Sequence, residues 1–412
     1  MNDWAFDDNS VSLPPGSNAK KDKESPSIRH ADFAPVRQFQ DSLFAQGIAG
    51  NDLAVFHAGR PVYRYMTGYR DLSAHLPITQ NTLYRIYSMT KPITAVVALR
   101  LWEKGAFRLD ESVEERMPAF HNFKIKGSLP DGTTACAPSP SPLRVMDLLT
   151  MTAGFDYNTE SPNLSALYKK TALRHTIRDV AETLARQPLS FPPGERWEYG
   201  LSFDVLAAFL EAVSGVPFGT LLREMVFEPL SMSSAAYEHE EADNPLLCHA
   251  YRMDRMGRYV RGPGLSNMLR SPLFEGGGAG LVMTVEDYAK FACMLTGYGI
   301  GVNGTRMLQK GTVEMMSQNH LHGRQLDDFF SSPMGRPGYG YGFGVRTLVD
   351  PGVARSPEGV GTISWGGALG TFVLMDPLHG LTFIYAQQRP GRWDETIPLK
   401  IRDLIFQALP TL

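Results

Sequence analysis

This 412-residue chain has few cysteines, little net charge and no long apolar run. Its three cysteines, Cys136, Cys248 and Cys293, are odd in number and widely spaced, a pattern that predicts neither a disulfide framework nor a zinc site. The formal net charge of −3 gives no basic surface for nucleic acid or for an anionic membrane. No apolar run reaches the length needed to span a bilayer. We therefore expect neither a nucleic-acid partner nor a membrane partner, and the sequence leaves the oligomeric state open.

The N-terminus, from Met1 to about Arg29, is polar and rich in Ser, Pro, Asn, Asp and Lys. It lacks the apolar core of about 7–15 residues that a secretory signal peptide needs. We interpret residues 1–30 as a flexible arm. A cytoplasmic location is the expectation that follows.

Two further absences narrow the chemistry. The His320-Leu321-His322 segment has no third ligand at a sensible spacing, so we expect no metal and no organic cofactor. No Gly-x-Ser-x-Gly sequence occurs, and the nucleophile elbow of α/β-hydrolases is therefore absent. The nearest approach is Gly264-Leu265-Ser266-Asn267-Met268, which makes Ser266 a weak rival nucleophile.

The most informative feature that is present is the tetrapeptide Ser88-Met89-Thr90-Lys91. Apolar residues then recur at helical spacing, which predicts a helix that starts near Ser88 and ends at Gly105. Residues three apart share a helix face, so Ser88 Oγ and Lys91 Nζ are expected to point the same way. A serine needs a neighbouring base to become a nucleophile, and a partly desolvated lysine can be that base. By itself the spacing is more typical of a serine cap followed by a solvated lysine.

Two later segments change that balance. Tyr199 follows the turn Pro192-Pro193-Gly194 and precedes a second amphipathic helix, so it is expected at a loop-to-helix junction. The segment from Thr362 to Met375 contains Trp365-Gly366-Gly367-Ala368 and reads as a strand, a glycine-rich bend and another strand. Glycines at such a bend let backbone approach a ligand closely. Alternatively, Tyr199 is a core aromatic and the bend is an ordinary hairpin.

Taken in this order, Ser-x-x-Lys, Pro-Gly-x-x-x-x-Tyr and Trp-Gly-Gly resemble the serine β-lactamase-like hydrolases. Within them, the chain is similar to the family VIII carboxylesterases, which look like class C β-lactamases. Three structural segments support the resemblance over most of residues 35–408: they are Leu148–Phe155, Gly276–Leu281 and Tyr339–Gly344.

Two departures from the penicillin-recognising pattern bear on the substrate. Those enzymes usually carry Lys-Thr-Gly where this chain has Trp365-Gly366-Gly367, and the lysine and threonine hold the carboxylate of a β-lactam. Class C enzymes also carry Tyr-x-Asn where this chain has Tyr199-Gly200-Leu201. We interpret Leu201 as the loss of a polar contact that makes the site more apolar. Both changes favour uncharged esters.

The resemblance implies a role for each matching residue. Ser88 is the expected nucleophile, and Lys91 with Tyr199 is the expected general base, with the atom that takes the proton left open. The backbone N–H groups of Ser88 and Ala368 are expected to hold the oxyanion. Trp365 would line the acyl or alcohol pocket, next to Gly366 and Gly367.

The fold class that follows is α/β of the α+β type, like that of β-lactamases and transpeptidases. Predicted strands at both ends of the chain suggest one antiparallel sheet flanked by helices. We expect an α/β domain from residues 31–105 and 270–412, and a mainly helical domain from residues 106–269. Within the latter, 127–142 reads as an irregular loop because it is rich in proline.

The favoured hypothesis is an esterase that works through an acyl-enzyme on Ser88. Its substrate would be a small-molecule ester with a short to medium acyl chain. A β-lactamase or D-amino-acid peptidase would use the same nucleophile. An acyltransferase would differ only in excluding water and admitting an alcohol. A non-catalytic binding protein on this scaffold is the remaining alternative, against which the intact Ser88, Lys91 and Tyr199 argue.

Overall fold

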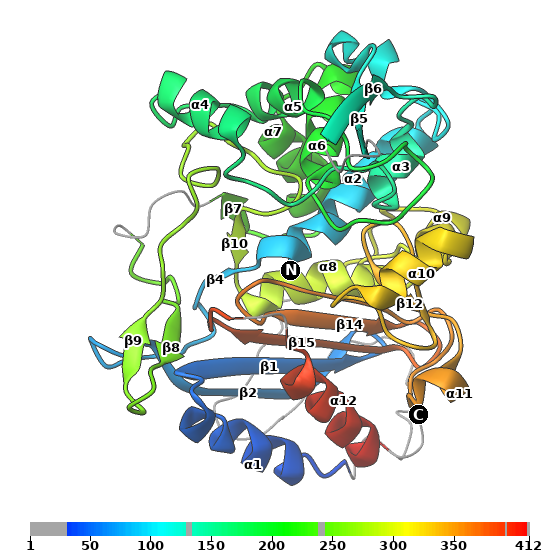
Figure 1. Ribbon diagram of the computed structural model, residues 1–412. Coiled ribbons are helices and arrows are strands. Elements are labelled where there is room, and N and C mark those ends of the chain that lie inside the picture. The colour runs from blue at the N-terminus through cyan, green and yellow to red at the C-terminus, as the bar shows by residue number, and fades with distance from the viewer. Residues whose placement is uncertain (1–30, 129–133, 238–243, 392–393, 410–412) are drawn as a thin grey trace.

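A computed structural model describes residues 31–128, 134–237, 244–391 and 394–409, so the predicted N-terminal arm lies outside the described residues. An antiparallel sheet made from both ends of the chain forms the lower half of the molecule (Figure 1). Its strands, in pairing order, are β11 (Tyr339–Tyr341), β12 (Arg346–Leu348), β13 (Ile363–Gly366), β14 (Phe372–Asp376), β15 (Leu381–Gln387), β1 (Gly50–His57), β2 (Arg60–Asp71) and β3 (Leu76–Pro77). The predicted antiparallel sheet is confirmed.

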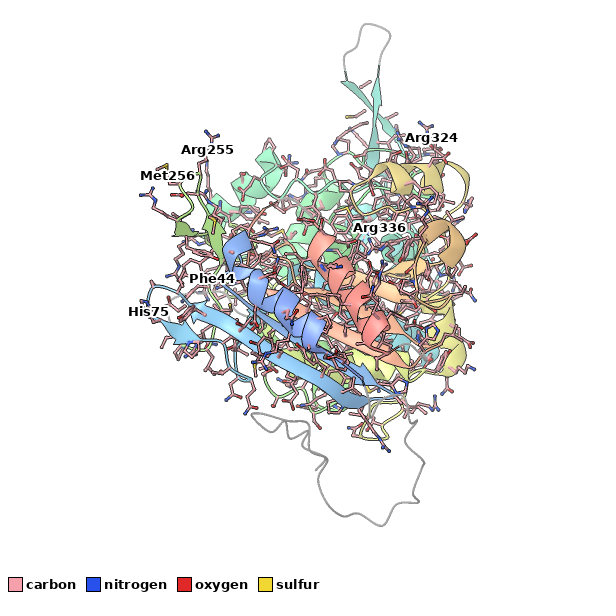
Figure 2. All side chains as sticks on the ribbon, turned by 90° about the horizontal axis from the view of Figure 1, so that it is seen from below. Phe44, His75, Arg255, Met256, Arg324 and Arg336 are labelled. Atoms are coloured by element: carbon pink, nitrogen blue, oxygen red, sulfur yellow. The ribbon has the colours of Figure 1, made fainter. Side chains whose placement is uncertain are left out.

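The central strands β1, β14 and β15 are buried along almost their whole length because both faces of the sheet are covered. In β1, Leu53 and Val55 face a core built with α1 and α12, whereas Ala54 and Phe56 face the main core. This alternation is the period-two geometry of a strand. Figure 2, seen from below, shows the two terminal helices lying across the outer face of the sheet.

Helices form the upper half of the molecule and cover the inner face of the sheet (Figure 1). The α-helices are α1 (Ala34–Ser42), α2 (Thr90–Glu103), α3 (Val145–Leu149), α4 (Pro162–Lys170), α5 (Ile177–Ala185), α6 (Ser202–Ser214), α7 (Phe218–Leu222), α8 (Val285–Thr296), α9 (Lys310–Met316), α10 (Gly323–Ser331), α11 (Pro351–Ala354) and α12 (Thr396–Ala408). Short turns are η2 (Phe44–Gln46), η3 (Tyr87–Met89), η4 (Val113–Glu115), η5 (Pro118–Phe120) and the π-helical η6 (Arg223–Phe227).

Helix α2 lies between the sheet and the helices of the upper half (Figure 1). It is buried from Thr90 to Leu99, because α6 and α7 pack on one side of it and η6 adds to that packing. A helix that is apolar all round belongs in a core. By length and composition, no single helix in the described ranges could cross a membrane, although α6 and the Phe218–Phe227 segment pass such a test together across an 84° bend.

Smaller strands lie outside the main sheet. They are β4 (Tyr84–Arg85), β10 (Leu281–Met283) and β7 (Ala236–Tyr237) in one sheet, the pair β5 (Lys124–Ser128) and β6 (Thr134–Pro138), and the pair β8 (Tyr251–Met253) and β9 (Tyr259–Arg261).

The prediction of an irregular loop over residues 127–142 is wrong in part. Residues 134–138 pair with β5 from Thr134 to Pro138, where Pro138 opposes Lys124 at the end of the ladder. A proline is tolerated there because the strand needs no further N–H donor beyond its end. Gly344, at φ +73°, lies in the turn between β11 and β12.

Candidate active site

Ser88 lies in η3, the turn that joins β4 to α2. Two backbone hydrogen bonds hold Ile86, the residue before this turn. Its N–H donates to Leu281 O at 3.1 Å, and its C=O accepts from Met89 N at 3.0 Å. Tyr87 has φ +44°, a conformation in which a bulky residue is strained. Such strain persists where the surrounding structure enforces it, often at functional sites.

Lys91 lies on the first turn of α2 and is completely buried. Its Nζ lies 3.2 Å from Ser88 Oγ and 2.9 Å from Gly278 O. The prediction that the serine and lysine side chains share one helix face is thus met by a hydrogen bond. The carbonyl of Gly278 is a contact that the sequence did not reveal.

Tyr199 lies three residues before the start of α6, at the predicted loop-to-helix junction, and its hydroxyl lies 2.7 Å from Ser88 Oγ. The backbone there approaches another segment closely, because a Cβ on Gly200 would lie 1.7 Å from Phe155 O. Only glycine fits such a contact. The Gly200 contact fixes the chain on the C-terminal side of Tyr199, and the position of the phenol follows from it.

Burial raises the pKa of the Tyr199 phenol above its usual value, and the negative charge of Asp204 acts in the same direction. Hydrogen bonds with Ser88 and with the Trp365 side chain lower it, but burial outweighs them. The phenol is therefore neutral at neutral pH and donates its proton to Ser88 Oγ. The Lys91 Nζ also lies 4.8 Å from the centroid of the Tyr199 ring.

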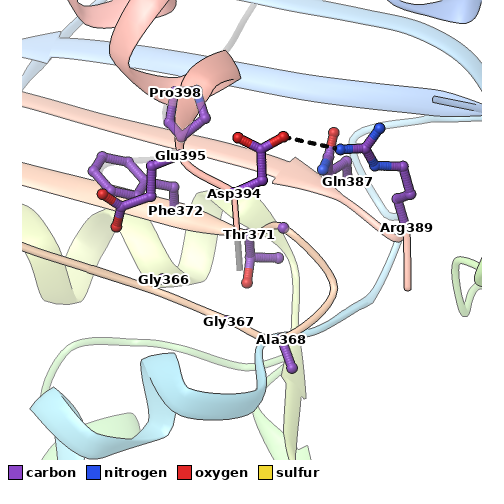
Figure 3. A pocket seen from close by; sticks show the side chains of 11 residues that line it. Gly366, Gly367, Ala368, Thr371, Phe372, Gln387, Arg389, Asp394, Glu395 and Pro398 are labelled. Atoms are coloured by element: carbon purple, nitrogen blue, oxygen red, sulfur yellow. Dashed lines mark hydrogen bonds and ion pairs between the residues drawn. The ribbon is translucent and has the colours of Figure 1, made fainter. Parts of the chain in front are cut away.

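The bend between β13 and β14 borders the site from the side of the sheet. Gly367 lies against the chain that leads to Ser88, since a Cβ on it would lie 2.4 Å from Ile86 O. Ala368, labelled in Figure 3, is exposed, and its backbone N–H donates to no protein acceptor within the described part of the chain. A backbone donor that is free and next to the nucleophile-bearing turn has the chemistry of an oxyanion contact.

Trp365 is buried, whereas a side chain that lines a pocket would be exposed to it. The residue is 1% exposed, and its ring packs on Tyr199 and Tyr341 at centroid distances of 5.7 and 5.5 Å. Its contact with Tyr199 is what the structure shows, whereas its contact with a substrate stays a prediction. Leu201 is completely buried in the main core. Our interpretation that it replaces a polar contact and makes the site more apolar stays a prediction.

A second tyrosine in the site was missed by the sequence analysis. Tyr157 stacks on Tyr199 with ring centroids 5.5 Å apart and an interplanar angle of 5°, and its ring centroid lies 5.6 Å from Lys91 Nζ. Although 41% of the residue is exposed, burial around its hydroxyl raises the pKa of Tyr157 to about 12, against the opposing effects of the Lys91 charge and of Ser88. The sequence signal was its place two residues after the Leu148–Phe155 segment.

The glycine-rich segment 276–280 passes between α2 and α6. Gly277 O accepts the Thr94 hydroxyl at 2.7 Å, and a Cβ on Gly277 would lie 2.1 Å from Phe203 O. Side chains at these positions would push the segment away from Lys91. The segment leads into β10 and then α8, in agreement with its predicted place before a late helix.

The rival nucleophile Ser266 lies in a turn. Its carbonyl accepts the N–H groups of Leu269 and Arg270 at 3.0 and 3.1 Å, so it begins a turn.

Two hollows, both open to solvent, flank this centre. One of about 380 Å³ lies behind the β13–β14 bend; its lining includes Ala368, Gln387, Arg389, Asp394 and Glu395 (Figure 3). The other, of about 210 Å³, is mainly apolar; it is lined by Arg85, Tyr87, Leu265, Leu269, Gly280 and Leu281. The apolar hollow touches the residue that precedes the nucleophile candidate, and the polar one touches the oxyanion candidate.

Comparisons with known proteins agree with this geometry. The family model described as Beta-lactamase matches residues 36–404. Protein Rv1367c of Mycobacterium tuberculosis is 30% identical over 328 residues, which are 78% of this chain and 81% of that protein. Esterase EstB of Burkholderia gladioli is 28% identical over 360 residues, 84% and 87% of the two chains. The solved structure of EstCE1, a hydrolase with promiscuous acyltransferase activity, superimposes with a TM-score of 0.74 at 25% identity, covering 92% of this chain and 98% of EstCE1.

Proposed function

This chain belongs to the β-lactamase family, and we propose that it is an esterase of that family, of the family VIII type, with Ser88 as its nucleophile. The observation that carries the proposal is the convergence of Lys91 Nζ at 3.2 Å and the Tyr199 hydroxyl at 2.7 Å on one nearly buried serine oxygen. The likeness to Esterase EstB and EstCE1 supports an ester as the substrate class.

In the acylation step, Ser88 Oγ forms a bond to the ester carbonyl carbon while its proton passes to the Lys91–Tyr199 pair. The carbonyl oxygen becomes an oxyanion, which the N–H groups of Ser88 and Ala368 stabilise. The bond to the alkoxide then breaks, and the alkoxide leaves with a proton from Tyr199. Attack by water on the acyl-enzyme, with the same pair as base, releases the acid and restores Ser88.

The surroundings of the bend support an uncharged substrate. Trp365-Gly366-Gly367 supplies no cation, and Arg389, which lines the neighbouring hollow, is paired with Asp394 at 3.4 Å. A carboxylate bound at this bend would lack a partner, and an unpaired buried charge is unfavourable. The apolar hollow lies beside Tyr87, next to the turn that carries Ser88, and a short to medium acyl group is the proposed acyl part of the substrate.

Acyl transfer to an alcohol is the second candidate, favoured by the likeness to EstCE1. The same acyl-enzyme would form, and an alcohol would replace water in the second step. The two outcomes differ only in the product of the second step.

The test is turnover of p-nitrophenyl butyrate with and without added alcohol. We expect hydrolysis by the wild type and none above background by Ser88→Ala, with thermal unfolding as the control that the variant is folded. A new ester that forms in proportion to the alcohol would show transferase activity. Undiminished turnover by the folded Ser88→Ala variant would contradict the proposal.

A further inference from the structure

A buried carboxylate lies behind the candidate catalytic lysine. Asp204 is on the first turn of α6, five residues after Tyr199 along the chain, and is 1% exposed. Its Oδ1 accepts the N–H of Gly278 at 3.1 Å. A buried carboxylate is unfavourable unless hydrogen bonds or an opposite charge compensate for its lost hydration. The groups around Asp204 must therefore provide that compensation.

Gly278 connects this carboxylate to the lysine. Its N–H donates to Asp204 and its C=O accepts from Lys91 Nζ at 2.9 Å. A Cβ at Gly278 would lie 2.6 Å from Asp204 Oδ2, so a larger residue would displace the carboxylate. Asp204 on α6 and Lys91 on α2 thus both hydrogen-bond to the backbone of Gly278.

The charges around the two groups favour an ion pair across Gly278. Burial holds the pKa of Asp204 above its usual value, and the charge of Lys91 and the Gly278 hydrogen bond oppose that rise and favour the ionised carboxylate. The negative charge of Asp204 also raises the pKa values of four surrounding phenols, which are Tyr157, Tyr168, Tyr199 and Tyr237. Lys91 in turn faces Ser88, Tyr157, Tyr199 and Asp204. Asp204 is therefore the carboxylate that compensates the lysine.

We propose that Asp204 is a positioning residue that holds Lys91 through Gly278 and keeps a proton on the Lys91–Tyr199 pair in the resting enzyme. This inference rests on the proposed function. The pair must lose one proton before it can accept that of Ser88. A negative charge nearby disfavours that loss, whichever of the two atoms gives up the proton. The same charge makes the deprotonated pair a stronger base.

The consequence is a pH profile with a defined direction of change. Acylation of Ser88 should rise with pH as the pair loses its proton. Asp204→Asn keeps an acceptor for Gly278 N–H but removes the charge, so the pair should lose its proton at lower pH. We expect the midpoint of the rise to fall by about one pH unit and the plateau at high pH to be lower than in the wild type.

The experiment measures the second-order rate of fluorophosphonate labelling from pH 5 to 10 on the full chain. In this reaction Ser88 Oγ forms a bond to phosphorus, fluoride leaves, and the serine proton passes to the pair. Asp287→Asn is the matched control. Asp287 is also a buried aspartate on the first turn of a helix, and it accepts Ser234 N–H at 2.6 Å, but its lysine partner is Lys290 at 2.7 Å. This control should leave the midpoint unchanged.

A midpoint for Asp204→Asn equal to those of the wild type and Asp287→Asn would overturn the inference, even if the plateau fell. Asp204→Ser, which also removes the charge, should give the same shift and serves if the asparagine variant does not fold. Failure of both to fold, where Asp287→Asn folds, would assign Asp204 a structural role and overturn the inference as well. Wild-type protein labelled at a residue other than Ser88 would instead contradict the proposed function.

Discussion

On one side of the candidate site, the starts of α2 and α6 bring three side chains into direct hydrogen-bonding contact, whereas on the other side the β13–β14 bend offers an indole and bare backbone. The Ser88, Lys91 and Tyr199 side chains are joined by contacts of 2.7 and 3.2 Å. The bend contributes the N–H of Ala368 and the packing of Trp365 on Tyr199.

The difference separates two requirements of acyl transfer. Proton transfer needs side chains held at fixed distances, and the helix starts supply them. Oxyanion stabilisation needs only donors that any residue other than proline carries. The bend can therefore change its side chains, and with them the substrate class, without loss of the chemistry. We call these two parts the helix side and the bend side.

The helix side should carry the largest effects. Ser88→Ala, Lys91→Ala and Tyr199→Phe should each lower kcat/KM for p-nitrophenyl butyrate by about 10⁴-fold or more, because the three groups act as one unit. Combining Lys91→Ala with Tyr199→Phe should add little. Near-wild-type turnover by Tyr199→Phe would show that Tyr199 is only a core aromatic; Tyr168→Phe, which removes a hydroxyl bonded to Thr159 O, is the control.

The bend side should show its effect through the backbone. Ala368→Pro removes one N–H donor and should lower kcat by about 10²–10³-fold, while Ala368→Ser, which keeps the donor, should stay near the wild-type rate. Steady-state kinetics on both variants checks this. An equal loss in the two variants would mean that the Ala368 side chain, and not its N–H, matters.

Substrate choice tests the absence of a cation on the bend side. The ratio of kcat/KM for p-nitrophenyl butyrate to that for a penicillin should be large. One missing charged contact is worth about 1.5–3 kcal/mol. Each such contact that the penicillin lacks should therefore change this ratio by about one to two powers of ten. Nitrocefin on the same preparation serves as the cephalosporin comparison. A penicillin value at or above the ester value would favour a β-lactamase with an unusual third motif.

Tyr157 should have the smallest effect. Tyr157→Phe removes one hydrogen bond near Ser88 but keeps the stacked ring, and one such bond is worth about 0.5–1.5 kcal/mol. We therefore expect kcat to fall about two- to tenfold, with KM little changed. A loss as large as that of Tyr199→Phe would make Tyr157 a member of the proton-transfer unit.

Much of this arrangement follows from local sequence patterns. The helical period after Ser88 and the i, i+3 spacing to Lys91 predict their contact, and apolar runs at both chain ends predict the antiparallel sheet. The turn before Tyr199 predicts its junction but gives no distance to Ser88. The roles of these residues, the two domain boundaries and the cytoplasmic location stay predictions.

What the sequence could not show depends on segments far apart in the chain. The Gly278 carbonyl meets Lys91 across 187 residues, and the stacking of Tyr157 on Tyr199 depends on how two loops approach. Leu201 packs in the main core although Tyr199, two residues before it, contacts Ser88. The order of residues in a motif does not fix the direction in which each side chain points where the chain passes from a loop into a helix.

The most direct test of the central claim is to locate the covalent adduct. Wild-type protein is treated with a fluorophosphonate, digested and mapped by mass spectrometry, alongside Ser88→Ala and Ser266→Ala. The account predicts one adduct, on Ser88, that persists in Ser266→Ala and is lost in Ser88→Ala. An adduct on Ser266, or labelling that survives in Ser88→Ala, would contradict it.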